Sequence, residues 1–258
     1  MCCAKILSAQ DFNITQRSHI EFPGETCANI CGYAQGGHEY ALVGCSKGMR
    51  IVEVTNPDAP VVIAQIPGPN NLWKEIKVYK HFAYVTTEAN GGGLQIVDLS
   101  GLPNATVPFT TYKGDGAIAG LLSKIHALHI DTTAGFVHLF GATLSNNQAV
   151  GDIVLDLKPD PMNPIYAGKW DVSYIHDGYV NNDTLYAGHI YAGYFSAIDF
   201  KDKSNPVLLS TTHTPGNFTH NVWPTGNGKY LLTTDEVSGS FLTSYDISDL
   251  TNIQEVDR

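Results

Sequence analysis

The chain is poor in basic residues and contains no long hydrophobic run. Lys and Arg number 15 against 25 Asp and Glu, which gives a formal net charge of −10 at pH 7. Nucleic-acid binding needs clustered basic side chains, so this balance argues against a nucleic-acid partner. Because no apolar run is long enough to span a bilayer, we expect no transmembrane segment in this chain. The acidic balance instead suits cations or neutral ligands.

The motifs of several common catalytic sites are also missing. The sequence has no G-x-S-x-G nucleophile motif, no Walker loop and no H-E-x-x-H metal motif. No C-x-x-C pair occurs, and the odd number of cysteines argues against a disulfide framework or a structural zinc site. The cysteines are Cys2, Cys3, Cys27, Cys31 and Cys45. A single bridge between Cys27 and Cys45 requires that their strands pair.

The sequence is rich in short β-patterned runs, and these runs repeat. The stretch from Trp73 to Leu99 holds three of them, at 73–79, 82–87 and 94–99, separated by tight turns. The same meander recurs at a spacing of about 45 residues, the length of a four-stranded propeller blade. The five readable units are 27–66, 73–112, 125–170, 175–212 and 219–256. We therefore predict an all-β fold, a β-propeller of four-stranded antiparallel blades whose first strands line the channel.

These units predict one domain. We expect residues 1–11 to form an N-terminal tail and residues 12–258 a single β-propeller domain. The segment from Phe12 to Gly24 resembles a fourth strand followed by a loop, which predicts that it completes the last blade and closes the ring. The fifth unit already ends in its own outer strand, so either the ring has five blades or further blades are missing. We favour an intact ring of six or seven blades, with this chain truncated at its C-terminal end.

An acidic residue closes the third run of every unit. These residues are Glu53, Asp98, Asp156, Asp199 and Asp246. An aspartate ahead of a turn usually accepts hydrogen bonds from the N–H groups of that turn. We therefore predict a structural role for them in preference to a catalytic one.

The starts of the five first strands share a recurrent histidine. They read CANIC, WKEIK, IHALH, IHDGY and THNVW, with His126, His176 and His220 at the second position. The ends of the second strands carry a further polar set, which consists of Glu88, His189, Asp235 and Glu236. In an antiparallel hairpin these two positions lie at the same edge, so both sets should face one mouth of the channel.

Imidazoles and carboxylates that converge from separate blades can bind a divalent metal ion such as zinc, iron, copper or manganese. We predict that His126, His176, His189 and His220 are metal ligands and that Glu236 or Glu88 supplies an oxygen ligand. The alternative is that these histidines bond to loop backbone, or line a wet channel that holds no metal.

Neighbouring residues at the same mouth are candidates for ligand binding. Glu75, Asp177 and Asn221 occupy the third position of the aligned strand starts, and Trp73 is placed to form a ligand wall. Lys74 takes a histidine-equivalent position, where we favour an ion pair with Glu75 and Glu88 over binding of an anionic substrate. The predicted ligand-binding set is Trp73, Lys74, Glu75, Glu88, Asp177, Asn221 and Asp235.

Three stretches resemble the LVIVD-repeat propellers and, more closely, the choice-of-anchor B family. They are EYALVGCSKGMRIVEVTNPDAPVVIAQIPGPNNLWKEIKVYKHFAYVTTEANGGGLQIVDLSGL, IHDGYVNNDTLYAGHIYAG and TPGNFTHNVWPTGNGKYLLTTDE. The family's HD, H-x-Y-A-G, HN-x-W and TTDE elements match residues 176–177, 189–193, 220–223 and 233–236. The resemblance implies a β-propeller on a secreted or surface protein whose variable anchor is C-terminal, in a family without an established activity. The sequence shows no readable signal peptide and no such anchor.

These observations lead to three functional hypotheses. The first is an extracellular or cell-surface β-propeller that binds a divalent metal ion or small ligand at the channel mouth and serves as an interaction module, with other surface proteins among its partners. The second is a metal-dependent oxidoreductase, hydrolase or lyase that resembles the selenium-binding methanethiol oxidases or propeller lyases. In that enzyme Glu236 or Asp177 would act as acid or base. The third is a purely structural surface protein.

Overall fold

The computed structural model describes residues 13–104 and 106–258, and these residues form five antiparallel sheets. The first sheet contains β1 (Cys27–Gln35), β2 (His38–Cys45), β3 (Gly48–Glu53) and β4 (Val61–Pro67). The second contains β5 (Ile76–Tyr79), β6 (Phe82–Val85), β7 (Leu94–Asp98) and β8 (Phe109–Tyr112). The third contains β10 (Ala127–Asp131), β11 (Phe136–Leu144), β12 (Ala149–Asp156) and β13 (Ile165–Trp170).

The last two sheets repeat this plan. The fourth contains β14 (Asp177–Asn181), β15 (Thr184–His189), β16 (Tyr194–Asp199) and β17 (Val207–His213). The fifth contains β18 (Thr219–Pro224), β19 (Tyr230–Asp235), β20 (Leu242–Asp246) and β21 (Gln254–Asp257). Two elements lie outside the predicted pattern, the 3₁₀ turn η1 (Gly116–Ile118) and the short strand β9 (Leu122–Lys124), which pairs with β11.

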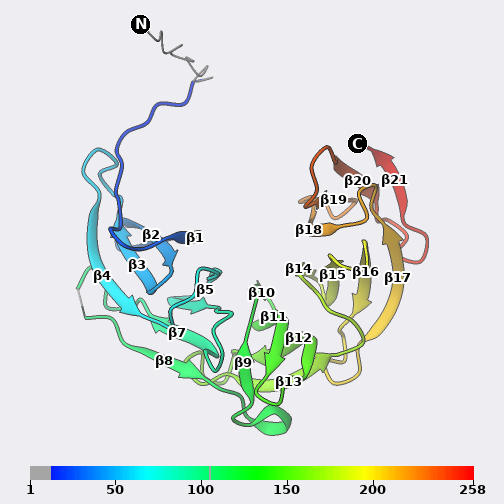
Figure 1. Ribbon diagram of the computed structural model, residues 1–258, viewed down its shortest axis with the longest axis horizontal. Coiled ribbons are helices and arrows are strands. Elements are labelled where there is room, and N and C mark those ends of the chain that lie inside the picture. Colours follow the sequence, from blue (N-terminus) through cyan, green and yellow to red (C-terminus); the bar gives the residue numbers. More distant parts are fainter. Residues whose placement is uncertain (1–12, 105) are drawn as a thin grey trace, which may run out of the picture.

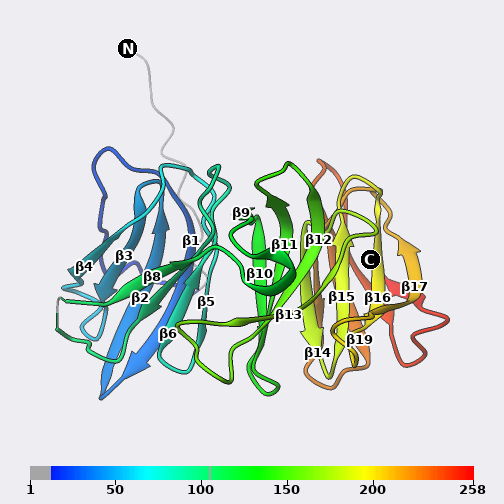
Figure 2. The ribbon, with the colours of Figure 1, turned by 90° about the horizontal axis from the view of Figure 1, so that it is seen from below.

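The sheets are arranged radially as the blades of a propeller (Figure 1). The first strand of each sheet lies innermost and the fourth lies at the rim, so the predicted fold class and all five units are confirmed. In the perpendicular view the inner strands β10 and β14 run along the channel axis and the outer strands are steeply inclined (Figure 2), as the twist of a sheet requires. The arc is open between the first and fifth blades (Figure 1), and a ring of six or seven blades stays a prediction.

The prediction that the N-terminal segment completes the last blade is wrong for its described part. Residues 13–24 contain no strand, and Arg17 instead bonds to Asp58 at 2.7 Å while Ser18 bonds to the Pro57 carbonyl. The outer position of the fifth blade is already taken by β21, which pairs with β20. The segment therefore lies against the first blade; Phe12 and the predicted tail lie outside the described residues.

Apolar contacts between neighbouring blades form the core. Four hydrophobic clusters are found among the described residues, and each is drawn from two adjacent sheets. Blades two to four thus pack against a neighbour on both faces, which explains why their second and third strands are buried at nearly every position. Within the described part of the chain, no further blade packs on the outward faces of the first and fifth blades, and Ile30 and Leu242 on them are 66% and 62% exposed.

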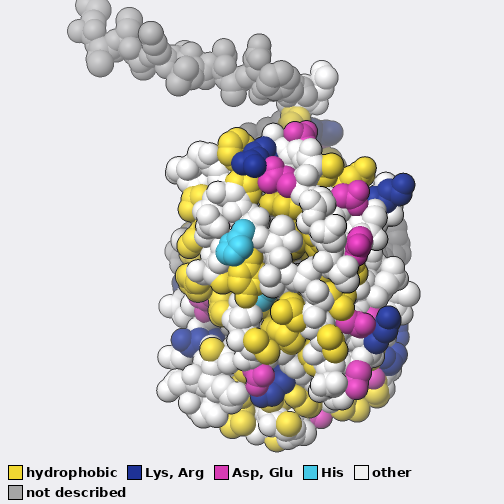
Figure 3. Space-filling model, turned by 90° about the vertical axis from the view of Figure 1, so that its right-hand side faces the viewer, with side chains coloured by type: hydrophobic (Ala, Val, Ile, Leu, Met, Phe, Trp, Pro, Cys, Tyr) yellow, Lys and Arg dark blue, Asp and Glu magenta, His cyan; other side chains and the backbone are white. Residues whose placement is uncertain are grey.

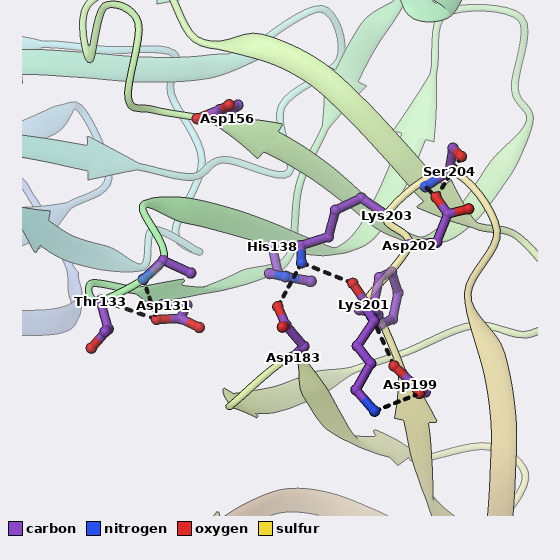
Figure 4. A network of polar contacts seen from close by, with 12 residues as sticks. Asp131, Thr133, His138, Asp156, Asp183, Asp199, Lys201, Asp202, Lys203 and Ser204 are labelled. Carbon is purple, nitrogen blue, oxygen red and sulfur yellow. Dashed lines mark hydrogen bonds and ion pairs between the residues drawn. The ribbon is translucent and has the colours of Figure 1, made fainter.

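The acidic residues that close the third strands organise turns, as predicted. Asp98, Asp156, Asp199 and Asp246 each accept a hydrogen bond from the N–H group two residues later, at 2.8–2.9 Å. Figure 4 shows Asp199 with its neighbour Lys201 in the fourth blade. Glu53 differs, because its carboxylate bonds to His38 Nδ1 at 2.6 Å.

Two further features are the distribution of charge on one face and the character of the helices. On the face that Figure 3 shows, charged side chains of both signs are interspersed, and the described residues form no continuous basic patch there. Among the described residues, no helix has the length and apolar character that a membrane crossing requires.

Candidate metal centre at the channel mouth

Three histidines from successive blades meet at one end of the channel. His126 and His176 directly precede β10 and β14, and His220 is the second residue of β18. The ring centroids of His126 and His176 lie 4.2 Å apart, and those of His176 and His220 lie 4.6 Å apart. Radial repetition of the blades therefore brings together side chains that are 50 and 44 positions apart in the sequence.

His176 is held in the orientation and tautomer of a metal ligand. Its Nδ1 donates a hydrogen bond to the His220 carbonyl oxygen at 3.2 Å, because a carbonyl can only accept. The lone pair is thereby left on Nε2. Burial, followed by the charges of His126 and His220, lowers the pKa of His176 to about 4, so this ring is neutral near pH 7. His176 as a whole is only 9% exposed.

His126 is held by a carboxylate. Its Nδ1 lies 2.5 Å from Glu88 Oε1, which orients Nε2 away from that partner. Burial acts to lower the pKa of His126, but the hydrogen bond and charge of Glu88 outweigh it, and the net pKa is raised. The same hydrogen bond lowers the pKa of Glu88. A carboxylate that orients a histidine is a common second layer around metal ions.

Glu236 adds an oxygen donor to this group. It directly follows β19, and its Oε2 lies 3.9 Å from His220 Nε2. One ligand atom each from His176, His220 and Glu236 can be chosen so that all three lie within 4.8 Å of one another. The side chain of Glu236 is 60% exposed, so the three donors face a partly open mouth. Two imidazoles and a carboxylate with an open side are a ligand set that zinc and related divalent ions accept.

The structure does not bring His189 to this cluster. His189 is buried within the fourth blade, where Nδ1 donates to the Tyr174 carbonyl at 2.8 Å and Nε2 lies 2.8 Å from Ser196 Oγ. Both ring nitrogens are therefore occupied. Burial lowers the pKa of His189 to about 4. This histidine stabilises the blade instead of completing a metal site.

Side chains at the third position of the aligned strand starts form hydrogen bonds to the backbone of the neighbouring blade. Asn29 Oδ1 accepts the N–H of Ile76 at 3.1 Å, and Glu75 Oε2 accepts the N–H of Leu128 at 2.9 Å. Each bond joins one inner strand to the next. The other carboxylate oxygen, Glu75 Oε1, forms an ion pair with Lys77 Nζ at 2.5 Å.

Asp177 and Asn221 continue the same pattern between the fourth and fifth blades. Asn221 donates its side-chain amide to Asp177 Oδ2, while Oδ1 accepts the N–H of Gly178 at 2.7 Å. Burial and then the charge of Glu75 raise the pKa of Asp177. Sequence reasoning assigned these groups to ligand binding and missed their bonds to adjacent blades, although the repeated polar third position was a signal.

Lys74 does not form the predicted ion pair. Its ammonium is buried and donates to the carbonyls of Pro69 and Asn71 at 2.9 and 3.0 Å and to Thr87 Oγ1 at 3.1 Å. Glu75 pairs with Lys77 instead, and Glu88 with His126. Burial lowers the pKa of Lys74 to about 8.

Asp235 likewise forms hydrogen bonds within the neighbouring loops. Its two oxygens accept bonds from Thr214 Oγ1, from the N–H groups of Gly216 and Phe218, and from Ser240 Oγ. Hydrogen bonds from Thr214, Gly216 and Phe218 outweigh the effect of burial and lower the pKa of Asp235. Asp235 thus fixes the loop that leads into β18 and His220.

A small cavity lies beside the histidines. Its volume is about 150 Å³, and its lining includes Trp73, Glu75, His126, His176 and His220. Trp73 is half exposed at its edge. Larger hollows of about 640 and 610 Å³ lie on the outward face of the first blade, away from the histidines. The cavity beside the histidines therefore suits an ion with its water or a small group.

Comparison with known proteins supports the fold. Residues 74–108 match the LVIVD repeat, and no curated protein matches the chain. A putative 6-phosphogluconolactonase from Bacteroides uniformis aligns with TM-score 0.62 and 12% identity over 88% of this chain and 69% of its own. The periplasmic gluconolactonase of Pseudomonas aeruginosa aligns with TM-score 0.60 and 9% identity over 89% of this chain and 71% of its own. The Cps50 (Swd1) β-propeller domain of Myceliophteria thermophila aligns with TM-score 0.57 and 10% identity over 90% of this chain and 73% of its own.

At these identities the similarity concerns the fold alone. The chain is a propeller repeat protein, and its LVIVD repeat coincides with the second blade. The narrower resemblance to the choice-of-anchor B family stays a prediction.

Proposed function

We propose that this propeller binds a divalent metal ion at the channel mouth through His176 Nε2, His220 and Glu236, and that it serves as a binding module. The observation that carries the proposal is the convergence of three donor atoms within 4.8 Å from two neighbouring blades. The Nδ1 bond of His176 to the next blade supports it, because it leaves Nε2 available for a metal.

His126 is the fourth candidate ligand. Its ring contacts that of His176, and Glu88 fixes its Nδ1, so Nε2 is the nitrogen left for a metal. When the metal is bound, His126 either joins the coordination shell or holds a water molecule against it. The carboxylate of Glu88 favours both roles because it supports positive charge on the imidazole.

The alternative is a metal-dependent enzyme at the same site. Three protein donors leave coordination positions for water or substrate, which is the arrangement of catalytic metal sites. Asp177 is a weak candidate for the base because both its oxygens already accept hydrogen bonds, and Glu236 is committed as a ligand. A 6-phosphogluconolactonase-like protein and a periplasmic gluconolactonase share this fold, so lactone hydrolysis is the first activity to assay.

Metal analysis of protein purified without a histidine tag tests the proposal. We expect close to one divalent ion per wild-type chain and loss of that ion in a variant carrying His176→Ala and His220→Ala. His81→Ala is the matched control. His81 lies in the turn between β5 and β6, at the end of β5 away from the histidine cluster, and its ring packs against Phe82. Equal metal content in wild type and double variant, with the β-rich circular dichroism unchanged, would leave the purely structural hypothesis.

Placement outside the cell belongs to the same proposal and rests on the family resemblance. Fractionation of cells that express the full-length protein tests it. We expect the protein in the medium or on the surface, where an externally added protease can reach it. Complete protection from that protease in intact cells would contradict this placement.

A further inference from the structure

We propose that Cys27 and Cys45 are the site of a cross-strand disulfide that fastens the innermost strand of the first blade. The two thiols are free in the structure, and their Sγ atoms lie 3.2 Å apart. The proposal is independent of the metal centre. Its basis is the register of two strands together with the contact between two sulfur atoms.

The strand register places the cysteines directly opposite one another. Cys27 begins β1 and Cys45 ends β2, and their Cα atoms are partners in the antiparallel ladder. The adjacent pair is bonded, because Ser46 N donates to the Thr26 carbonyl at 2.8 Å. Cys27 and Cys45 therefore occupy a non-hydrogen-bonded pair, in which Cα atoms are about 4.5 Å apart and side chains are closest. That separation lies within the range that a disulfide spans.

The two thiols differ in access, which sets the order of the chemistry. Cys27 is exposed on the outward face of the first blade, whereas Cys45 is buried. Burial and the hydrogen bond to Cys27 raise the pKa of Cys45 to about 12, so Cys45 is a protonated thiol near pH 7. Cys27 is thus the sulfur that a small disulfide oxidant reaches first.

The reaction is a thiol–disulfide exchange with a low-molecular-weight disulfide such as oxidised glutathione. The Cys27 sulfur attacks one sulfur of the oxidant, forms a mixed disulfide and releases one reduced molecule. Cys45 then attacks the Cys27 sulfur, the Cys27–Cys45 bond forms, and a second reduced molecule leaves. The two cysteines lose two electrons, and their two protons end on the two released thiols.

The bridge would reinforce a strand that lacks one layer of packing. The outward face of β1 is not covered by another described blade, and Ile30 on it is largely exposed. Ala28 and Asn29 of the same strand line the cavity beside the histidines. A bond from Cys27 to the buried end of β2 would hold this wall of the cavity in place.

Peptide mapping after equilibration in a glutathione buffer tests the proposal. We expect a peptide pair linked through Cys27 and Cys45 in wild type, with a loss of two hydrogens from the intact mass and a melting temperature raised by about 5 °C. Cys27→Ser should abolish both effects, and Cys31→Ser, the matched control on the same strand, should retain both. Cys27 is exposed, so its variant should fold as the reduced wild type does.

Two results would overturn the proposal. One is complete alkylation of both Cys27 and Cys45 in folded protein that has been equilibrated under oxidising conditions. The other is linkage of Cys27 to Cys2 or Cys3 in place of Cys45.

Discussion

His176 Nδ1 donates a hydrogen bond to the backbone carbonyl of His220, the residue at the same position of the next blade, at 3.2 Å. This one hydrogen bond joins two blades, fixes the orientation of an imidazole and leaves its Nε2 without that partner, in a ring that lies next to those of His126 and His220. The site is therefore a product of the blade repeat, because the group that orients one histidine is the backbone of its equivalent.

Glu88→Gln tests the role of the carboxylate behind His126. We expect metal affinity to fall about 10-fold, because the amide no longer supports positive charge on the ring. Isothermal titration with Zn²⁺ at pH 7 measures the change, and Glu39→Gln, at the exposed position of β2, is the control. An unchanged affinity would remove Glu88 and His126 from the metal centre.

Acid should destabilise the metal-free fold through its buried histidines. Burial lowers the pKa of His129 to about 3 and those of His176 and His189 to about 4. Below the ordinary histidine pKa of about 6.5, these histidines bind protons in the unfolded chain but stay neutral in the folded chain. The contribution of these three histidines to stability is therefore complete above about pH 6.5 and falls toward pH 4, by about 1.4 kcal/mol per pH unit for each of them.

The pKa of His126 is raised and acts in the opposite direction: its contribution is present below about pH 6.5 and is lost at higher pH. Urea unfolding at pH 7 and pH 5 in the presence of a chelator measures the balance. His129→Gln should shrink the difference between the two pH values, since glutamine can still accept the Val180 N–H bond that His129 Nδ1 now accepts. The same difference in wild type and variant would contradict this assignment.

Asp235→Ala separates structure from ligand binding. Four donors lose their acceptor, so we expect the free energy of unfolding to drop by about 2–4 kcal/mol. The folded protein should still bind one metal ion at saturation. Loss of metal without loss of stability would instead support the ligand role that the sequence suggested.

The repeat made the fold and the histidine cluster predictable. Alternating apolar residues between glycine turns specified the strands, and equivalent positions in a radial array must lie near one another, which brought His126, His176 and His220 together.

Side-chain direction and contacts between blades were not predictable in the same way. His189 ends a second strand at the expected edge, yet its ring turns into the blade toward Ser196. The partners of Glu75 and Asn29 lie on the next blade, and their bonds depend on a register between blades that no local pattern encodes. Lys74 likewise finds loop carbonyls instead of a carboxylate.

The most direct test of the metal centre is a crystal structure of the zinc-loaded protein, with anomalous diffraction recorded on both sides of the zinc absorption edge. The account predicts one strong anomalous peak within about 2.0–2.2 Å of His176 Nε2, a His220 nitrogen and a Glu236 oxygen. A zinc peak elsewhere in the folded protein, or no peak beside these three side chains at saturating zinc, would contradict it.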